Sequence, residues 1–152
     1  MDKLNYKQEV LAKAKEKQQE LLNDFKTRMQ DLEGSEVHMN EGQYDATQHS
    51  QNTSSEELME GLQDQMEMAE KEMSILENLK MDELISSVKM GAIVKTNHFN
   101  FFPSVSVERF NVGETEFFGI STKAPIYQEM LNKGAGDSFE FNGKSYTIEE
   151  VY

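Results

Sequence analysis

The sequence has no cysteine and no tryptophan, and only two of its 152 residues are proline. Without cysteine, the chain has no disulfide, no thiol nucleophile and no cysteine-based zinc site. It also has no apolar run that approaches the roughly 18 residues of a membrane helix. Residues 1–10 lack the apolar stretch that a signal peptide needs. These absences predict a cytoplasmic protein that does not act in a membrane.

Charge is abundant but unevenly distributed, with a formal net charge of −13. Residues 1–33 carry 7 basic and 7 acidic side chains, residues 34–80 carry 2 and 11, and residues 81–152 carry 6 and 10. Such an acidic chain is poorly suited to gripping a nucleic-acid backbone, which requires a basic face. It suits a basic protein groove or a position near metal ions, although a plain solvated surface has the same composition.

The first third of the chain has the seven-residue periodicity of a coiled coil. The stripe predicts a helix over residues 2–32, without a proline or glycine before Gly34. Its two heptad positions are occupied by Leu4, Leu11, Gln18, Phe25 and Leu32, and by Lys7, Ala14, Leu21 and Arg28.

A second helix is predicted over residues 55–79, because Ser54 and Glu57 have the spacing of a capping box, as do Thr53 and Glu56 one residue earlier. A polar linker at residues 33–53 would join the two helices. Residues 1–80 are therefore predicted to form an antiparallel hairpin with an arm of ~45 Å. A parallel coiled coil between two chains is the structural alternative. The second seam consists of Met59, Leu62, Met66, Ala69, Met73 and Leu76.

Beyond residue 80 the pattern changes to the period of two that is typical of β-strands. Strands are predicted at residues 88–95, 101–110 and 116–121, and a hairpin at 139–151 whose type I′ turn is Asn142–Gly143. A short helix should begin at Pro125 and end near residue 133, before Gly134. Residues 81–152 are thus predicted to form a small antiparallel β domain with one short helix, which gives the chain an α+β fold. The aromatic cluster Phe99, Phe101 and Phe102 could form an exposed patch for a partner or alternate between the core and the domain's junction with the coiled coil.

Residues 88–152 resemble the C-terminal domain of the GreA/GreB transcript cleavage factors, a domain with an FKBP-like fold. In that family a strand ending in Ile-Ser precedes a helix that starts with Ser-Pro and ends with Leu-x-Lys. A Gly-Asp turn and a closing β-hairpin follow. The segment Gly91–Val94 looks like the family's first strand. Lys123 and Ala124 stand where the family has Asp or Asn followed by Ser. The matching residues, in order, are Ile120, Ser121, Pro125, Ile126, Leu131, Lys133, Gly136 and Asp137.

The resemblance implies an accessory factor of RNA polymerase rather than an enzyme. The β domain would dock at the rim of the polymerase secondary channel through Lys123, Ala124 and Pro125. The hairpin would enter the channel, where carboxylates at its tip help to hold a second Mg²⁺ for cleavage of backtracked RNA. This reading implies no intrinsic cofactor or metal in the free protein, which should be a monomer. Nucleic acid would be contacted only within the transcription complex.

The tip of the hairpin resembles the family in the segment Asn40–Ala46. The family places an Asp and a Glu just before a Tyr. Aligned on Tyr44 without gaps, those positions hold Val37 and Asn40, whereas a shift of one residue offers Glu36 and Glu41. Asp45 is a third, weaker candidate for the carboxylate function.

Three functions therefore remain open at this point. A Gre-type factor could stimulate cleavage or only block the channel. An FKBP-like prolyl isomerase is disfavoured because the short domain has no tryptophan and no obvious aromatic-lined pocket in its sequence. A generic coiled-coil interaction protein is the third possibility.

Overall fold

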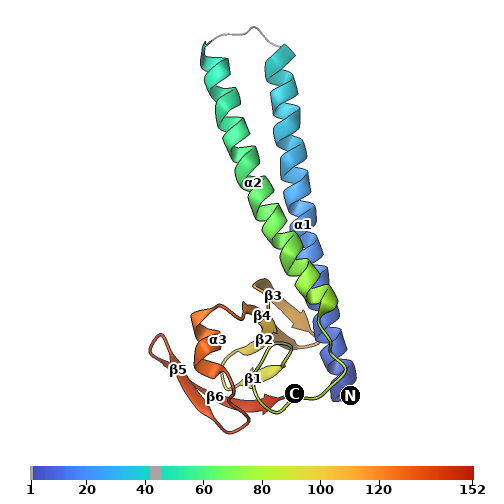
Figure 1. The fold of residues 1–152 in the computed structure, drawn as a ribbon, viewed down its shortest axis with the longest axis vertical. Helices are drawn as coiled ribbons and strands as arrows, with labels where there is room; N and C mark the ends of the chain where they lie inside the picture. The colour runs from blue at the N-terminus through green and yellow to red at the C-terminus, as the bar shows by residue number, and fades with distance from the viewer. Residues whose placement is uncertain (1, 42–45) are drawn as a thin grey trace. The chain divides into compact units, whose positions relative to one another are not determined.

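The structure is a computed structural model that describes residues 2–41 and 46–152, with side chains left undescribed at residues 35–55. Two compact units are present. The sheet unit comprises Met1–Gln18 and Glu72–Tyr152, and the hairpin unit comprises Gln19–Lys71. The sequence predicted two consecutive segments divided at residue 80. The sheet unit instead contains residues from both the beginning and the end of the chain. The elements are α1 (Lys3–Glu41), α2 (Ala46–Asn78), β1 (Val94–Thr96), β2 (Asn100–Ser104), β3 (Val107–Val112), β4 (Thr115–Ser121), α3 (Pro125–Met130), β5 (Ser138–Phe141) and β6 (Lys144–Val151) (Figure 1).

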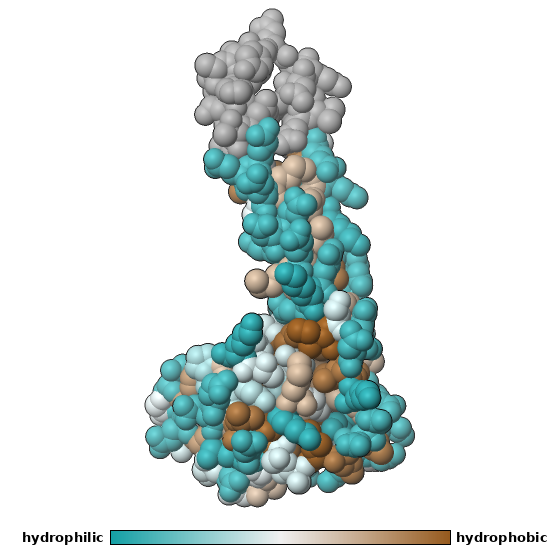
Figure 2. Space-filling view, viewed as in Figure 1, coloured by the Kyte–Doolittle hydropathy of each residue, from teal (hydrophilic) through white to brown (hydrophobic). Residues whose placement is uncertain are grey.

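The hairpin unit is an antiparallel pair of helices within one chain, as the two heptad stripes predict (Figure 1). Leu22 and Phe25 of α1 and Ala69 of α2 are buried in it. Further along the hairpin unit, Leu32 of α1 lines the same surface hollow as Leu62 of α2. The described part of the hairpin is mostly hydrophilic on the face shown in Figure 2. This narrow seam explains how the chain folds with only 37% hydrophobic residues.

Both helices extend much further than the sequence pattern predicted. The linker expected at residues 33–53 is wrong, because α1 continues to Glu41 and α2 already begins at Ala46. The 39 residues of α1 make a helix of about 58 Å. The capping-box signals at Thr53 and Ser54 lie inside α2. Ser or Thr followed by Glu also occurs within helices, and without proline nothing in this segment forbids the helical backbone.

The sheet unit is built on one six-stranded sheet with the order β3-β4-β2-β1-β6-β5. The α+β class is confirmed, and all strand pairs are antiparallel except β2 and β4, which run parallel. Asn142 and Gly143 have φ values of 52° and 75°, so the predicted type I′ turn between β5 and β6 is confirmed.

Three predicted boundaries in the sheet unit are wrong. Of the strand predicted at residues 88–95, only residues 94 and 95 lie in β1, which ends at Thr96. Val88 instead forms backbone hydrogen bonds with Asn132 and Lys133. The run 101–110 divides into β2 and β3. Helix α3 ends at Met130, since Leu131 is extended and Asn132 has a left-handed φ of 67°.

Adjacent phenylalanines in the sheet face opposite cores, as the period of two requires. Phe102 and Phe117 are fully buried in a cluster with Val10 of α1 and Leu76 of α2. Phe101 and Phe118 belong to a second cluster that α3 covers with Tyr127 and Met130. Among the described residues, no helix is sufficiently long and apolar to cross a membrane.

Candidate functional site

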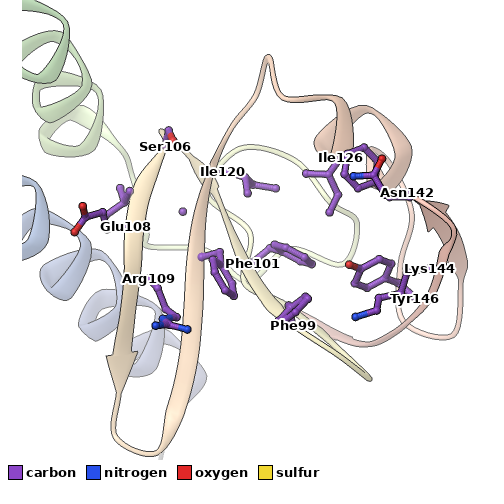
Figure 3. Close-up of a pocket in the computed structure, with 14 residues that line it drawn as sticks. Phe99, Phe101, Ser106, Glu108, Arg109, Ile120, Ile126, Asn142, Lys144 and Tyr146 are labelled. Atoms are coloured by element: carbon purple, nitrogen blue, oxygen red, sulfur yellow. The ribbon is translucent and has the colours of Figure 1, made fainter. Parts of the chain in front are cut away.

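A groove of about 640 Å³, which we call the aromatic groove, lies on the face of the sheet that also carries α3 (Figure 3). Strand β3 forms one wall, and the β5–β6 hairpin with Ile126 of α3 forms the other. A volume of this size is in the range of binding sites for small ligands or for a few side chains of a partner. Its lining residues include Phe99, Phe101, Phe118, Phe141 and Tyr146, with Ile120 and Ile126.

The strand register places these aromatic rings together. Phe101 of β2 pairs with Phe118 of β4 across the parallel ladder, so both side chains emerge on the same face. Gly119 follows Phe118 and lacks a side chain where β3 approaches closely. This close approach brings β3 up to the groove and forms its wall.

The aromatic rings that line the groove contact one another in edge-on and tilted arrangements. The ring centroids of Phe99 and Phe118 are 5.3 Å apart at an interplanar angle of 80°, and those of Phe101 and Tyr146 are 6.1 Å apart at 61°. Phe139 stacks on Tyr146 at 4.9 Å. Phe99 nevertheless remains 39% exposed, a large value for a residue within an aromatic cluster. A partly exposed aromatic residue that is held by ordered neighbours offers apolar contact area at small entropic cost.

Cationic groups lie at the rim of the aromatic groove. The Lys144 ammonium group is 5.0 Å from the centroid of the Phe99 ring, within the distance of a cation–π interaction. Arg109 of β3 pairs with Glu116 at 3.7 Å, and both side chains are largely exposed. Glu108 is the acidic member of the rim. The groove therefore combines an apolar floor with a mixed rim in which Lys144 is available to an acidic group.

The predicted docking segment, residues 123–125, directly precedes Ile126 of α3 in the chain. The Lys123 backbone N–H donates to the Ser121 hydroxyl oxygen at 3.1 Å, which fixes the turn into α3. Lys123 and Pro125 are exposed, whereas Ala124 is half-buried against the core. The next residue, Ile126, lines the groove, whereas Lys123, Ala124 and Pro125 are not among its lining residues.

The predicted tip carboxylates cannot be placed as side chains. Glu36 and Glu41 belong to the helical backbone of α1, but their side chains lie outside the described set. Asp45 lies outside the described residues altogether. Within the described part of the chain, no group of three or more His, Asp or Glu side chains is arranged to hold a metal ion.

Sequence reasoning missed the aromatic groove, and its statement that no aromatic-lined pocket is evident is wrong. The sequence left open whether Phe99, Phe101 and Phe102 form an exposed patch or alternate between two buried environments. In the structure Phe101 and Phe102 are buried, whereas Phe99 is exposed. The partners of Phe99 come from distant strands. The clustering of aromatic residues after residue 98 was the available signal, but it does not reveal which rings share a face.

Neither a protein-family model nor a curated protein sequence matches this chain. Among solved structures, that of the transcription factor Gfh1 is similar to this chain with a TM-score of 0.37 and 16% sequence identity. The match covers 91% of this chain and 93% of the Gfh1 chain. At these values the similarity assigns neither a family nor a function.

Proposed function

We propose that the protein is a Gre-type transcription elongation factor, which binds RNA polymerase through its sheet unit and inserts its helical hairpin into the secondary channel. The observation that carries this proposal is the structural role of the residues that resemble the family. Ser121 ends β4, and Pro125 is the first residue of α3, where its missing N–H costs no hydrogen bond. Gly136 has a φ of +91°, and the Asp137 carboxylate accepts the Gly134 N–H at 2.8 Å. The residues that resemble the family therefore lie at the end of a strand, at the start of a helix and in a turn, as the resemblance implies.

The helical hairpin supports the same proposal. A pair of long antiparallel helices with a narrow seam and hydrophilic outer faces is suited to a water-filled protein channel. The acidic surplus is concentrated in residues 34–80, with 11 acidic and 2 basic side chains. Carboxylates are suitable ligands for the hard Mg²⁺ ions of a polymerase active site.

The surface formed by Lys123, Pro125 and the aromatic groove is proposed as the docking site. Its partner would be a polymerase segment that presents an apolar side chain to Phe99 and an acidic group to Lys123 or Lys144. Burial of the apolar side chain would contribute most of the affinity, and the charges would set the orientation. The polymerase would supply the catalytic metal site, and this protein would have no intrinsic cofactor.

At the hairpin tip, Glu36 and Glu41 are proposed to complete the coordination of the second Mg²⁺, with Asp45 as a weaker candidate. A pair of carboxylates on a narrow arm binds Mg²⁺ weakly by itself, because this ion holds its water shell firmly. The polymerase carboxylates would complete the site. If these acids do not reach the metal, the protein would act as a channel-blocking regulator.

The deciding experiment measures RNA cleavage in backtracked complexes that are assembled with RNA polymerase from the same organism. Stimulated cleavage supports the cleavage factor. Binding to core polymerase with inhibited elongation and no cleavage supports the channel-blocking regulator. Failure to bind core polymerase at micromolar concentration would reject both versions and leave an interaction protein with another partner.

The aromatic groove favours one second candidate, an FKBP-like prolyl isomerase. An apolar, ring-lined groove can desolvate the imide bond of an X–Pro peptide, whose isomerisation is otherwise slow. A protease-coupled assay with a proline tetrapeptide tests this activity. Catalysis that is lost in Phe99→Ala and Tyr146→Ala would support the isomerase, and an uncatalysed rate with the wild-type protein would remove it.

A further inference from the structure

A second pocket of the sheet unit, here called the lysine pocket, has a polar character quite different from that of the aromatic groove. Its volume is about 290 Å³, and it lies between α1 and the connection from α2 to β1. Lys7 of α1 lines it together with Lys80 and Lys89 of the connection. Gly91 closes the connection with a φ of +91°, a conformation that favours glycine.

Lys7 is the unusual member of this pocket, because only 1% of the residue is exposed. Its ammonium group donates to the backbone carbonyl oxygen of Glu83 at 2.8 Å. An ammonium group has three donors, so this single neutral acceptor satisfies only one of the hydrogen-bonding groups of the buried charge. Among the residues that the structure describes, no carboxylate forms an ion pair with Lys7, Lys80 or Lys89.

The charges around Lys7 also disfavour its protonated form in the absence of a bound anion. Burial lowers the pKa of Lys7 from its ordinary value, and repulsion from Lys89 lowers it further. Attraction to Asp82 and to Glu83 opposes these effects, but each attraction is smaller than the repulsion from Lys89. Both acidic residues are exposed. The lining of the pocket itself carries three lysines against two carboxylates, so a bound anion would find a net positive charge there.

We propose that the lysine pocket binds a small oxyanion of the phosphate class, with the ammonium groups of Lys7, Lys80 and Lys89 as its ligands. Three cations and the two flanking carboxylates leave one uncompensated positive charge, which suits a phosphate anion. The volume is at the lower end for small-molecule sites, so inorganic phosphate or diphosphate fits and a whole nucleotide does not. Charge-assisted hydrogen bonds would then fill the free donors of Lys7. This site is independent of the proposed action on RNA polymerase.

The test is isothermal titration calorimetry of the full chain with inorganic phosphate and with diphosphate, at an ionic strength held constant with sodium chloride. We expect one site per chain in the wild-type protein. Lys89→Gln and Lys80→Gln should each weaken binding at least about tenfold. The matched control is Lys26→Gln, which removes an exposed lysine of α1 outside the pocket and should leave the affinity unchanged. Circular dichroism establishes that each variant is folded.

A second measurement follows the Lys7 side chain by NMR, and it does not depend on a Lys7 variant that could fail to fold. Phosphate should raise the pKa of Lys7, because the anion stabilises its charged form. No binding of either anion to the wild-type protein would overturn the proposal. Equal affinity in the wild-type protein and in the Lys80→Gln/Lys89→Gln double variant would overturn it as well.

Discussion

Gly119 and Val107 pair across β4 and β3 so closely that a Cβ atom on Gly119 would lie 2.6 Å from the Cβ of Val107 and 2.9 Å from the Val105 carbonyl oxygen. No real side chain tolerates such distances, so β3 must shift if Gly119 is replaced. Gly119→Ala should lower the free energy of unfolding by about 1–3 kcal/mol, the usual cost of overpacking. Urea denaturation measures the change. The control is Gly61→Ala on exposed α2, where a Cβ meets nothing within 4 Å and stability should rise by up to ~1 kcal/mol. Equal stability of Gly119→Ala and wild type would contradict the close approach.

Glu72 gives a prediction about pH, because burial raises the pKa of its carboxyl group above the ordinary value of 4.5. The folded state therefore holds the proton more tightly than the unfolded state. The charged form destabilises the fold at neutral pH, and this penalty disappears as the pH falls through the raised pKa to below 4.5. Glu72→Gln should accordingly be more stable than wild type at pH 7, with a difference that shrinks toward pH 4. Thermal unfolding across this range tests the sign. Glu70→Gln, at an exposed position of the same helix, should show no such trend.

The docking segment predicts a change in affinity without a change in folding. Lys123→Glu combined with Pro125→Ala should weaken binding to core polymerase at least about tenfold, or about 1.4 kcal/mol, because both side chains are exposed on the proposed surface. Phe99→Ala should weaken it independently. Surface plasmon resonance gives the dissociation constants, and Lys13→Glu controls for the altered net charge. A folded double variant with unchanged affinity would place the docking surface elsewhere.

The hairpin tip predicts a change in chemistry without a change in affinity. If wild-type protein stimulates cleavage, replacement of Glu36 and Glu41 by alanine should reduce the rate at least ~10-fold, about 1.4 kcal/mol of barrier. The dissociation constant should remain the same, since docking belongs to the sheet unit. Glu56→Ala with Glu57→Ala on α2 removes the same charge and is the matched control. Undiminished cleavage would exclude Glu36 and Glu41 from the mechanism.

Local sequence patterns correctly predicted those structural features that depend on residues close together in the sequence. The heptad stripes identified two paired helices, and Asn142–Gly143 identified its turn, because few residues adopt two consecutive positive φ values. Pro125 similarly identified the start of α3. The residues at which helices and strands begin and end were less predictable. The helical stretch beyond residue 32 lacks an apolar stripe, and polar residues without proline adopt either a loop or a helix.

The aromatic groove and the lysine pocket could not be read from the sequence, because each is assembled from distant segments. Lys7 occupies a heptad position, where periodicity alone gives no reason to expect a buried charge next to Lys89. Phe101 and Phe118 share a face because β2 and β4 pair in that register, and the intervening β3 hides this pairing from any local pattern.

The discontinuous sheet unit has a consequence for the order of folding. Val10 and Ala14 are fully buried in the same cluster as Phe102 and Phe117, so residues near the start of the chain complete a core that most of the remaining sequence must first supply. During synthesis the hairpin unit can pair its helices early, from neighbouring segments. The sheet unit must wait for contacts of high sequence separation, which form slowly. A fragment starting at residue 81 would therefore expose an apolar sheet face and be prone to aggregation.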